Sequence, residues 1–90
     1  MAEENTIFVG KKPTMNYVLA IVTQFNNNDV ERIIIKARGK SISKAVDIAE
    51  ITRHKFVQSI KYEKITLDTE ILEGERGPSN VSSIEIVLSK

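Results

Sequence analysis

The chain of 90 residues is long enough for one hydrophobic core, so we expect a single domain over residues 1–90. Its 41% hydrophobic and 28% charged residues are typical of a folded globular protein. The lack of cysteine excludes a disulfide framework, and one histidine is too few for a zinc site of the usual kind, so we expect no metal.

The first ten residues are acidic and contain no long apolar stretch, which predicts neither a signal peptide nor a membrane span. Together with the lack of cysteine, this favours a cytoplasmic location. The formal net charge is only +1, but its distribution is uneven. Residues 10–44 carry seven basic and two acidic side chains, whereas residues 63–76 carry two basic and five acidic ones. The chain therefore has a basic end and an acidic end.

The first half of the sequence predicts a strand, a helix and a second strand. Residues 6–9 form a short apolar run that Gly10 closes. Pro13 suits the first turn of a helix, and apolar residues recur at three- and four-residue intervals from Met15 to Phe25. Three consecutive isoleucines at positions 33–35 then predict a strand. This order and spacing indicate a right-handed parallel crossover.

A second helix is predicted over residues 41–58, after a turn at Gly39. On a wheel of 3.6 residues per turn, one apolar stripe contains Ile42, Ala45, Val46, Ala49 and Phe56, and Ile48 and Ile51 lie outside it. An apolar arc of this width exceeds what covering one small sheet requires. We therefore expect a homodimer, with Ile48, Ile51 and Phe56 as interface candidates.

The last third of the sequence predicts two strands joined by a long loop. Residues 60–72 alternate, with Ile65, Leu67 and Ile71 expected to face inward. Turn-forming residues follow at 73–80, and residues 81–88 predict the returning strand. The loop is too long for a two-residue turn, so the hairpin tip should project and be mobile.

Two basic groups follow the first two predicted strands. Lys11 and Lys12 follow the first, and Arg38, Lys40 and Lys44 follow the second. Because the ends of these strands lie at one edge of a βαβ unit, we expect the five side chains to form an anion-binding surface, where helix N–H groups could also hold a phosphate. A lysine pair can instead be merely solvated, and the nearby Tyr17 is explained equally well by helix packing or by a ligand contact.

Other candidate sites are weaker. Gly39-Lys40-Ser41 resembles the end of a P-loop, but Ile34 stands where that loop needs glycine, so we expect no nucleotide cofactor and no enzyme. His54 has no metal-binding or nucleophile pattern around it and is interpreted as a solvated helix residue. Glu70, Glu73 and Glu75 lack calcium-loop spacing and are interpreted as parts of a solvated hairpin.

Two blocks of sequence resemble the signature blocks of the Alba family of archaeal chromatin proteins. They are GKKPTMNYV at residues 10–18 and IKARGKSISKAVD at residues 35–47, and VSSIEI at residues 81–86 is similar to the last strand of that family. The resemblance covers nearly the whole chain. It implies a two-layer α/β (α+β) fold of order βαβαββ, with a mixed four-stranded sheet, two helices and a projecting C-terminal β-hairpin.

The resemblance also implies a function. It suggests a chromosome-associated homodimer that binds double-stranded DNA and RNA without strong sequence demands, and whose dimers could associate further along DNA. The implied nucleic-acid contacts are Lys11, Lys12, Asn16, Tyr17, Arg38, Lys40 and Lys44, with Arg76 on a hairpin arm that reaches along the minor groove. Acetylation is implied at Lys11 and Lys12.

The chain departs from this pattern in its hairpin, where Glu73 and Glu75 put negative charge on the arm. An alternative function follows from that departure. The chain would then be an RNA-binding subunit of a ribonucleoprotein assembly, with the acidic hairpin in contact with a protein partner.

Overall fold

The first half of the chain folds into a strand, a helix and a parallel strand. The structure is a computed structural model that describes residues 5–90. Residues 1–4, which begin the amino-terminal segment considered above, lie outside the described residues. Strand β1 (Asn5–Phe8) leads into helix α1 (Thr14–Phe25) and strand β2 (Arg32–Arg38). Because β1 and β2 pair in parallel, the predicted parallel crossover is confirmed.

The second half adds a helix and a long hairpin. Helix α2 (Ser41–Ile51) continues into a π-helical segment, η1 (Thr52–Phe56), and strands β3 (Lys61–Leu72) and β4 (Ser79–Ser89) follow. The change of helix type begins at Thr52, whose buried hydroxyl donates to the Ile48 carbonyl at 2.7 Å. The strand order in the sheet is β1-β2-β4-β3, with antiparallel pairs β2–β4 and β4–β3. The predicted βαβαββ fold and mixed sheet are therefore confirmed.

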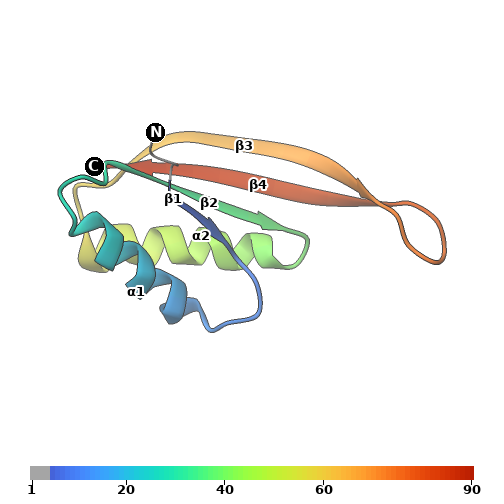
Figure 1. Cartoon of the computed structure of the whole chain (residues 1–90), viewed down its shortest axis with the longest axis horizontal. Coiled ribbons are helices and arrows are strands. Elements are labelled where there is room, and N and C mark those ends of the chain that lie inside the picture. Colours follow the sequence, from blue (N-terminus) through green and yellow to red (C-terminus); the bar gives the residue numbers. More distant parts are fainter. Residues whose placement is uncertain (1–4) are drawn as a thin grey trace.

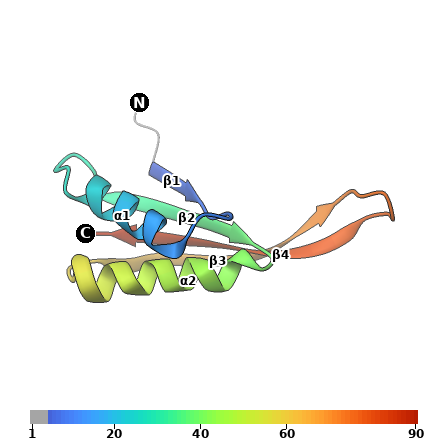
Figure 2. The same ribbon diagram turned by 90° about the horizontal axis from the view of Figure 1, so that it is seen from below.

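Both helices cover one face of the sheet, so the molecule has two layers (Figure 1). Alternate side chains of the two central strands point toward the helices and form the core with the buried stripes of α1 and α2. The main buried residues are Ile33, Ile35, Ala37, Ile84, Ile86 and Leu88 from the strands, and Val18, Ile21, Phe25, Ala45, Ile48 and Ala49 from the helices. The opposite face of the sheet, here called the open face, carries no helix of residues 5–90, because both helices lie on the side that Figure 2 shows.

The buried stripe of α2 differs from the predicted one. Ile48 is fully buried beside Ala45 and Ala49, whereas Val46 and Phe56 are exposed. The prediction that Ile48 faces a partner is wrong, because its side chain has no surface left to offer. Ile51 packs against the core and is only partly buried, so Ile51 and Phe56 stay as candidates for a dimer interface.

A β-bulge between Tyr62 and Lys64 changes the predicted alternation of β3. Tyr62 lies opposite the buried Leu88, and after the bulge Ile65 and Leu67 lie opposite the buried Ile86 and Ile84, so all three point to the helix side. Ile65, Leu67 and Ile71 therefore lie on the predicted inward side of the sheet, but no helix covers them. These side chains are 54%, 73% and 66% exposed, since α2 packs on β2 and β4.

The β3–β4 hairpin projects well beyond the helices, as the sequence predicted (Figure 1). It accounts for much of the longest dimension of the molecule, 46 Å. At the tip, Gly74 and Gly77 exchange backbone hydrogen bonds of 3.2 and 3.0 Å. Gly77 has a φ of 102°, which favours glycine at that position.

Candidate nucleic-acid interface

The loop after β1, residues 9–13, is held by hydrogen bonds to a side chain of helix α1. The Tyr17 hydroxyl accepts hydrogen bonds from the backbone N–H groups of Gly10 and Lys12, at 2.8 and 3.3 Å. The Val9 N–H donates to the Lys36 carbonyl at 2.9 Å and so extends the β1–β2 ladder by one residue. The loop is therefore held in one shape while Lys11 and Lys12 stay exposed at its surface.

Helix α2 fastens the same loop from the other side. The Lys44 ammonium donates to the carbonyls of Gly10 and Lys12, at 2.9 and 3.0 Å. These two contacts join the loop that follows β1 to the first turn of α2, the helix that follows β2. Two of the three ammonium N–H groups are committed to the protein. Lys44 therefore brings positive charge to the site but acts first on the shape of the loop.

The turn between β2 and α2 brings Lys40 to the same end of the sheet. Gly39 has a φ of 59°, a conformation that favours glycine, and its N–H donates to the Ser82 carbonyl at 2.8 Å. Lys40 follows at the N-cap position, directly before α2, and is exposed, and no side chain caps the helix there. The turn thus places an ammonium group beside the amino end of a helix.

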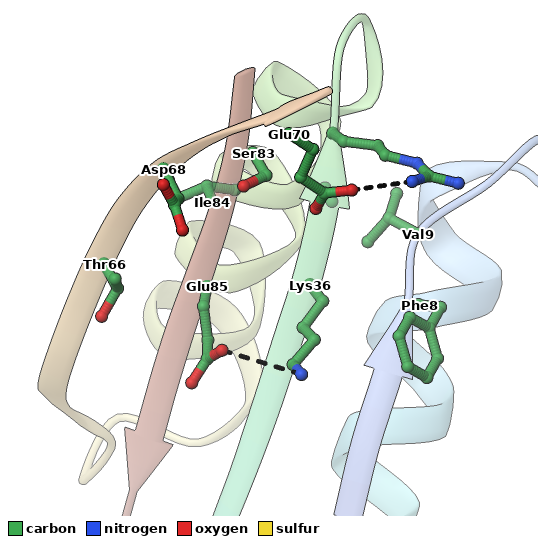
Figure 3. A pocket seen from close by; sticks show the side chains of 11 residues that line it. Phe8, Val9, Lys36, Thr66, Asp68, Glu70, Ser83, Ile84 and Glu85 are labelled. Carbon is green, nitrogen blue, oxygen red and sulfur yellow. Dashed lines mark hydrogen bonds and ion pairs between the residues drawn. The ribbon is translucent and has the colours of Figure 1, made fainter. Parts of the chain in front are cut away.

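Arg38 is engaged within the protein. Its Nη1 donates to Oε1 of Glu70 at 2.8 Å, and the two side chains are 57% and 43% exposed (Figure 3). Next along β2, the ammonium of Lys36 lies 3.7 Å from a Glu85 oxygen and 5.9 Å from the centre of the Phe8 ring. These contacts were not predicted, because they join residues that only the sheet brings together.

The open face is hollowed around these ion pairs. The hollow has a volume of about 530 Å³ and is lined mainly by β2, β3 and β4 (Figure 3). Its charged lining residues are Lys36, Arg38, Asp68, Glu70 and Glu85. Since both signs of charge are interspersed, this hollow is not a uniformly basic surface.

The predicted nucleic-acid contacts divide into two places. Asn16 is exposed in the first turn of α1, close in sequence to the lysine pair. Together with Asn16, the basic edge comprises Lys11, Lys12, Tyr17, Arg38, Lys40 and Lys44. Arg76 stands apart from them, exposed in the loop that joins β3 to β4.

A polar cluster that the sequence did not predict lies at the carboxyl end of α2. Tyr62 donates a hydrogen bond to Glu50, whose carboxylate also accepts from Arg53 at 3.2 and 3.3 Å. The ring of His54 lies 3.1 Å from Glu50, so this exposed histidine has a protein partner. The hydrogen bonds from Tyr62 and Arg53 lower the pKa of Glu50 from 4.5 to about 2. Burial and the bond to Glu50 raise the pKa of Tyr62 to about 12.

Within residues 5–90, no group of three or more histidine, cysteine or acidic residues is arranged to hold a metal ion. Over the same residues, no helix is long and apolar enough to cross a membrane. The fold and its basic edge thus define a small two-layer α+β protein with a cationic end and a projecting hairpin.

Comparison with known proteins identifies the family. A model of the Alba family matches residues 5–69, and the chain belongs to this family. It is 80% identical, over the full length of both chains, to a protein of Picrophilus torridus named DNA/RNA-binding protein Alba. A solved structure of Alba from Thermoplasma volcanium matches with a TM-score of 0.90 and 77% identity, covering 96% of this chain and 100% of that one.

A more distant relative has the same fold. The crystal structure of ALBA1 from Trypanosoma brucei matches with a TM-score of 0.72 and 26% identity. The match covers 100% of this chain and 72% of the other. The fold therefore extends to sequences that differ from this one at most positions.

The Glu50 cluster predicts an acid-dependent loss of stability. A carboxyl group with a lowered folded-state pKa stabilises the fold above its unfolded value, and this contribution is lost as the pH falls from about 4.5 to about 2. In Glu50→Gln the stability should depend less on pH in that window. Tyr62→Phe, which removes the largest cause of the shift, should lose part of the dependence as well.

Urea unfolding measured between pH 2 and pH 6 provides the test, since the slope of the unfolding free energy against pH reports the difference in protons bound by the unfolded and folded states. Parallel curves for the wild type and both variants would contradict the assignment.

Proposed function

We propose that this chain binds double-stranded DNA and RNA with little dependence on sequence, and that it associates with the chromosome. The observation that carries the proposal is the basic edge, where a loop fixed by Tyr17 and Lys44 presents Lys11 and Lys12 beside Lys40. Relatives of nearly equal length that are named DNA/RNA-binding proteins support the same function. A binding protein, not an enzyme, is therefore proposed.

The chemistry of the basic edge suits backbone phosphates better than base edges. A lysine ammonium is a point charge on a flexible stem, which neutralises phosphate but reads no particular base pattern. The side chains that carry this charge, Lys11, Lys12 and Lys40, are all exposed. Binding of this kind releases counterions, so the affinity should fall steeply as salt rises.

Tyr17 and Lys44 are proposed to act mainly by positioning the loop. Their polar atoms contact the backbone of Gly10 and Lys12, and a ligand that reached them would meet groups already engaged. Acetylation of Lys11 or Lys12 is the proposed modification. It removes a charge from the exposed edge and should weaken binding without disturbing the loop.

The lysine pair predicts a sequence-independent loss of affinity. Lys11→Ala or Lys12→Ala should weaken binding about equally for unrelated duplexes, because a phosphate contact is lost. If each site occurs twice in a dimer, the slope of log affinity against log salt should fall by about 1 to 2.

Lys61→Ala is the matched control, since Lys61 is also exposed but lies at the other end of the sheet, opposite Ser89. It should leave the slope nearly unchanged. A loss for one sequence alone, at constant slope, would point to base readout instead.

A homodimer is proposed as the functional unit. Phe56 is 44% exposed on the helix side of the fold, where Ile65 and Leu67 of β3 are also uncovered. Burying such apolar area stabilises an interface by roughly 25 cal/mol per Å² removed from water. A two-fold contact through this side would double the basic edge on one particle.

The uncovered side of β3 predicts how to break the dimer. Leu67→Glu should shift the protein to a monomer, because it would bury a charge against an apolar partner. Leu19→Glu is the control on the exposed surface of α1 and should leave the dimer intact. Sedimentation at micromolar concentration decides the matter, and a monomeric wild type would contradict the proposed homodimer.

The hairpin arm is proposed to enter the minor groove through Arg76. The negative potential of a narrow groove should then penalise Glu73 and Glu75, so changing both to glutamine should strengthen duplex binding and Arg76→Ala should weaken it. The effect should shrink with salt, because exposed charges are screened over about 8 to 10 Å at physiological ionic strength. If neither change alters affinity at low salt while Lys11→Ala does, a protein partner at the acidic tip becomes the better explanation.

A further inference from the structure

The ion pair between Arg38 and Glu70 crosses the sheet at the base of the hairpin. Arg38 ends β2 and lies opposite Ser83, while Glu70 lies on β3 opposite Val81. Both partner positions are on β4, so the pair spans the strand between β2 and β3 on the open face (Figure 3). Arg38, a member of the basic edge, therefore already contacts an anion supplied by the chain itself.

We propose that Glu70 is an affinity-setting residue that competes with nucleic-acid phosphate for Arg38. This inference rests on the proposed binding of nucleic acid. A carboxylate and a phosphate present similar oxygen pairs to the guanidinium, so the two anions are alternative partners for the same group. In the unbound protein Glu70 holds Arg38. On binding, a backbone phosphate takes its place and the carboxylate returns to water.

The exposure of the pair makes this exchange feasible. Both side chains are about half exposed, and the contact runs through one terminal nitrogen, Nη1, at 2.8 Å. Exposed pairs of this kind are weak, so a phosphate can displace the carboxylate without opening the core. The buried neighbours Ala37 and Ile84 point to the opposite side of the sheet and are not involved.

The same sheet contains a matched control at its other end. Arg32 and Glu63 also join β2 to β3, at 2.8 Å and with 47% and 42% of their side chains exposed. Arg32 is the first residue of β2 and Arg38 the last, so this second pair is remote from the loops that follow β1 and β2. Glu63→Gln therefore removes the same charge from the same strand without acting on the basic edge.

The test is a double-mutant cycle with one short DNA duplex at low salt, comparing the wild type, Glu70→Gln, Arg38→Ala and the double variant. Glu70→Gln should bind about two- to five-fold more tightly than the wild type, the range expected for removing a surface ion-pair competitor. Arg38→Ala should bind more weakly, and adding Glu70→Gln to it should restore little. Glu63→Gln should bind as the wild type does.

Glu70→Asp gives a second variant that keeps the charge but shortens the side chain by one methylene group, and it should show part of the gain. Equal gains from Glu70→Gln with and without Arg38 would overturn the inference, because the effect would then be repulsion by net charge alone. Weaker binding by Glu70→Gln would also overturn it and would make the pair a strut for the hairpin. A wild type with no salt-dependent duplex affinity would instead remove the proposed function itself.

Discussion

The contact between the Lys44 ammonium and the carbonyls of Gly10 and Lys12 organises the basic edge of this protein. The parallel pairing of β1 and β2 brings two loops to one edge, but backbone topology alone does not fix their shapes. The ammonium fixes the shape of the loop after β1 with two charge-assisted hydrogen bonds, and the Tyr17 hydroxyl of α1 accepts two more from the same loop. Lys44 thus contributes to the basic edge mainly by holding the backbone from which Lys11 and Lys12 project.

The charge asymmetry of the sequence takes a different form in three dimensions. The acidic segment, residues 63–76, does not form a separate lobe, because only β4 lies between β3 and the basic strand β2. Ion pairs of the open face offset part of the positive charge of β2, through Glu63, Glu70 and Glu85. The exposed lysines of the basic edge lie outside these pairs. The site is therefore defined as much by where charge is compensated as by where it is concentrated.

Much of the fold could be predicted because the spacing of apolar residues differs between helices and strands. The position of Lys11 and Lys40 at one edge of the sheet followed from the parallel crossover. The side of α2 that is buried could not be predicted, since its apolar arc is wide enough to allow either Ile48 or Val46 inside. The Arg38–Glu70 pair was equally hidden. Its formation depends on the registers of two strand pairs at once, and no local pattern records them.

One extra residue at the bulge of β3 determines which side chains of the projecting hairpin lie on the helix side and which lie on the open face. Tyr62 and Ile65 are an odd number of positions apart, yet both point to the helix side, and Glu70 consequently reaches the open face. Loss or gain of a single residue there would turn the arm inside out. Isoleucine and leucine would then line the charged hollow, and carboxylates would lie over the apolar flank. Alterations in chain length are therefore far less tolerable at this point than at the glycine-rich tip.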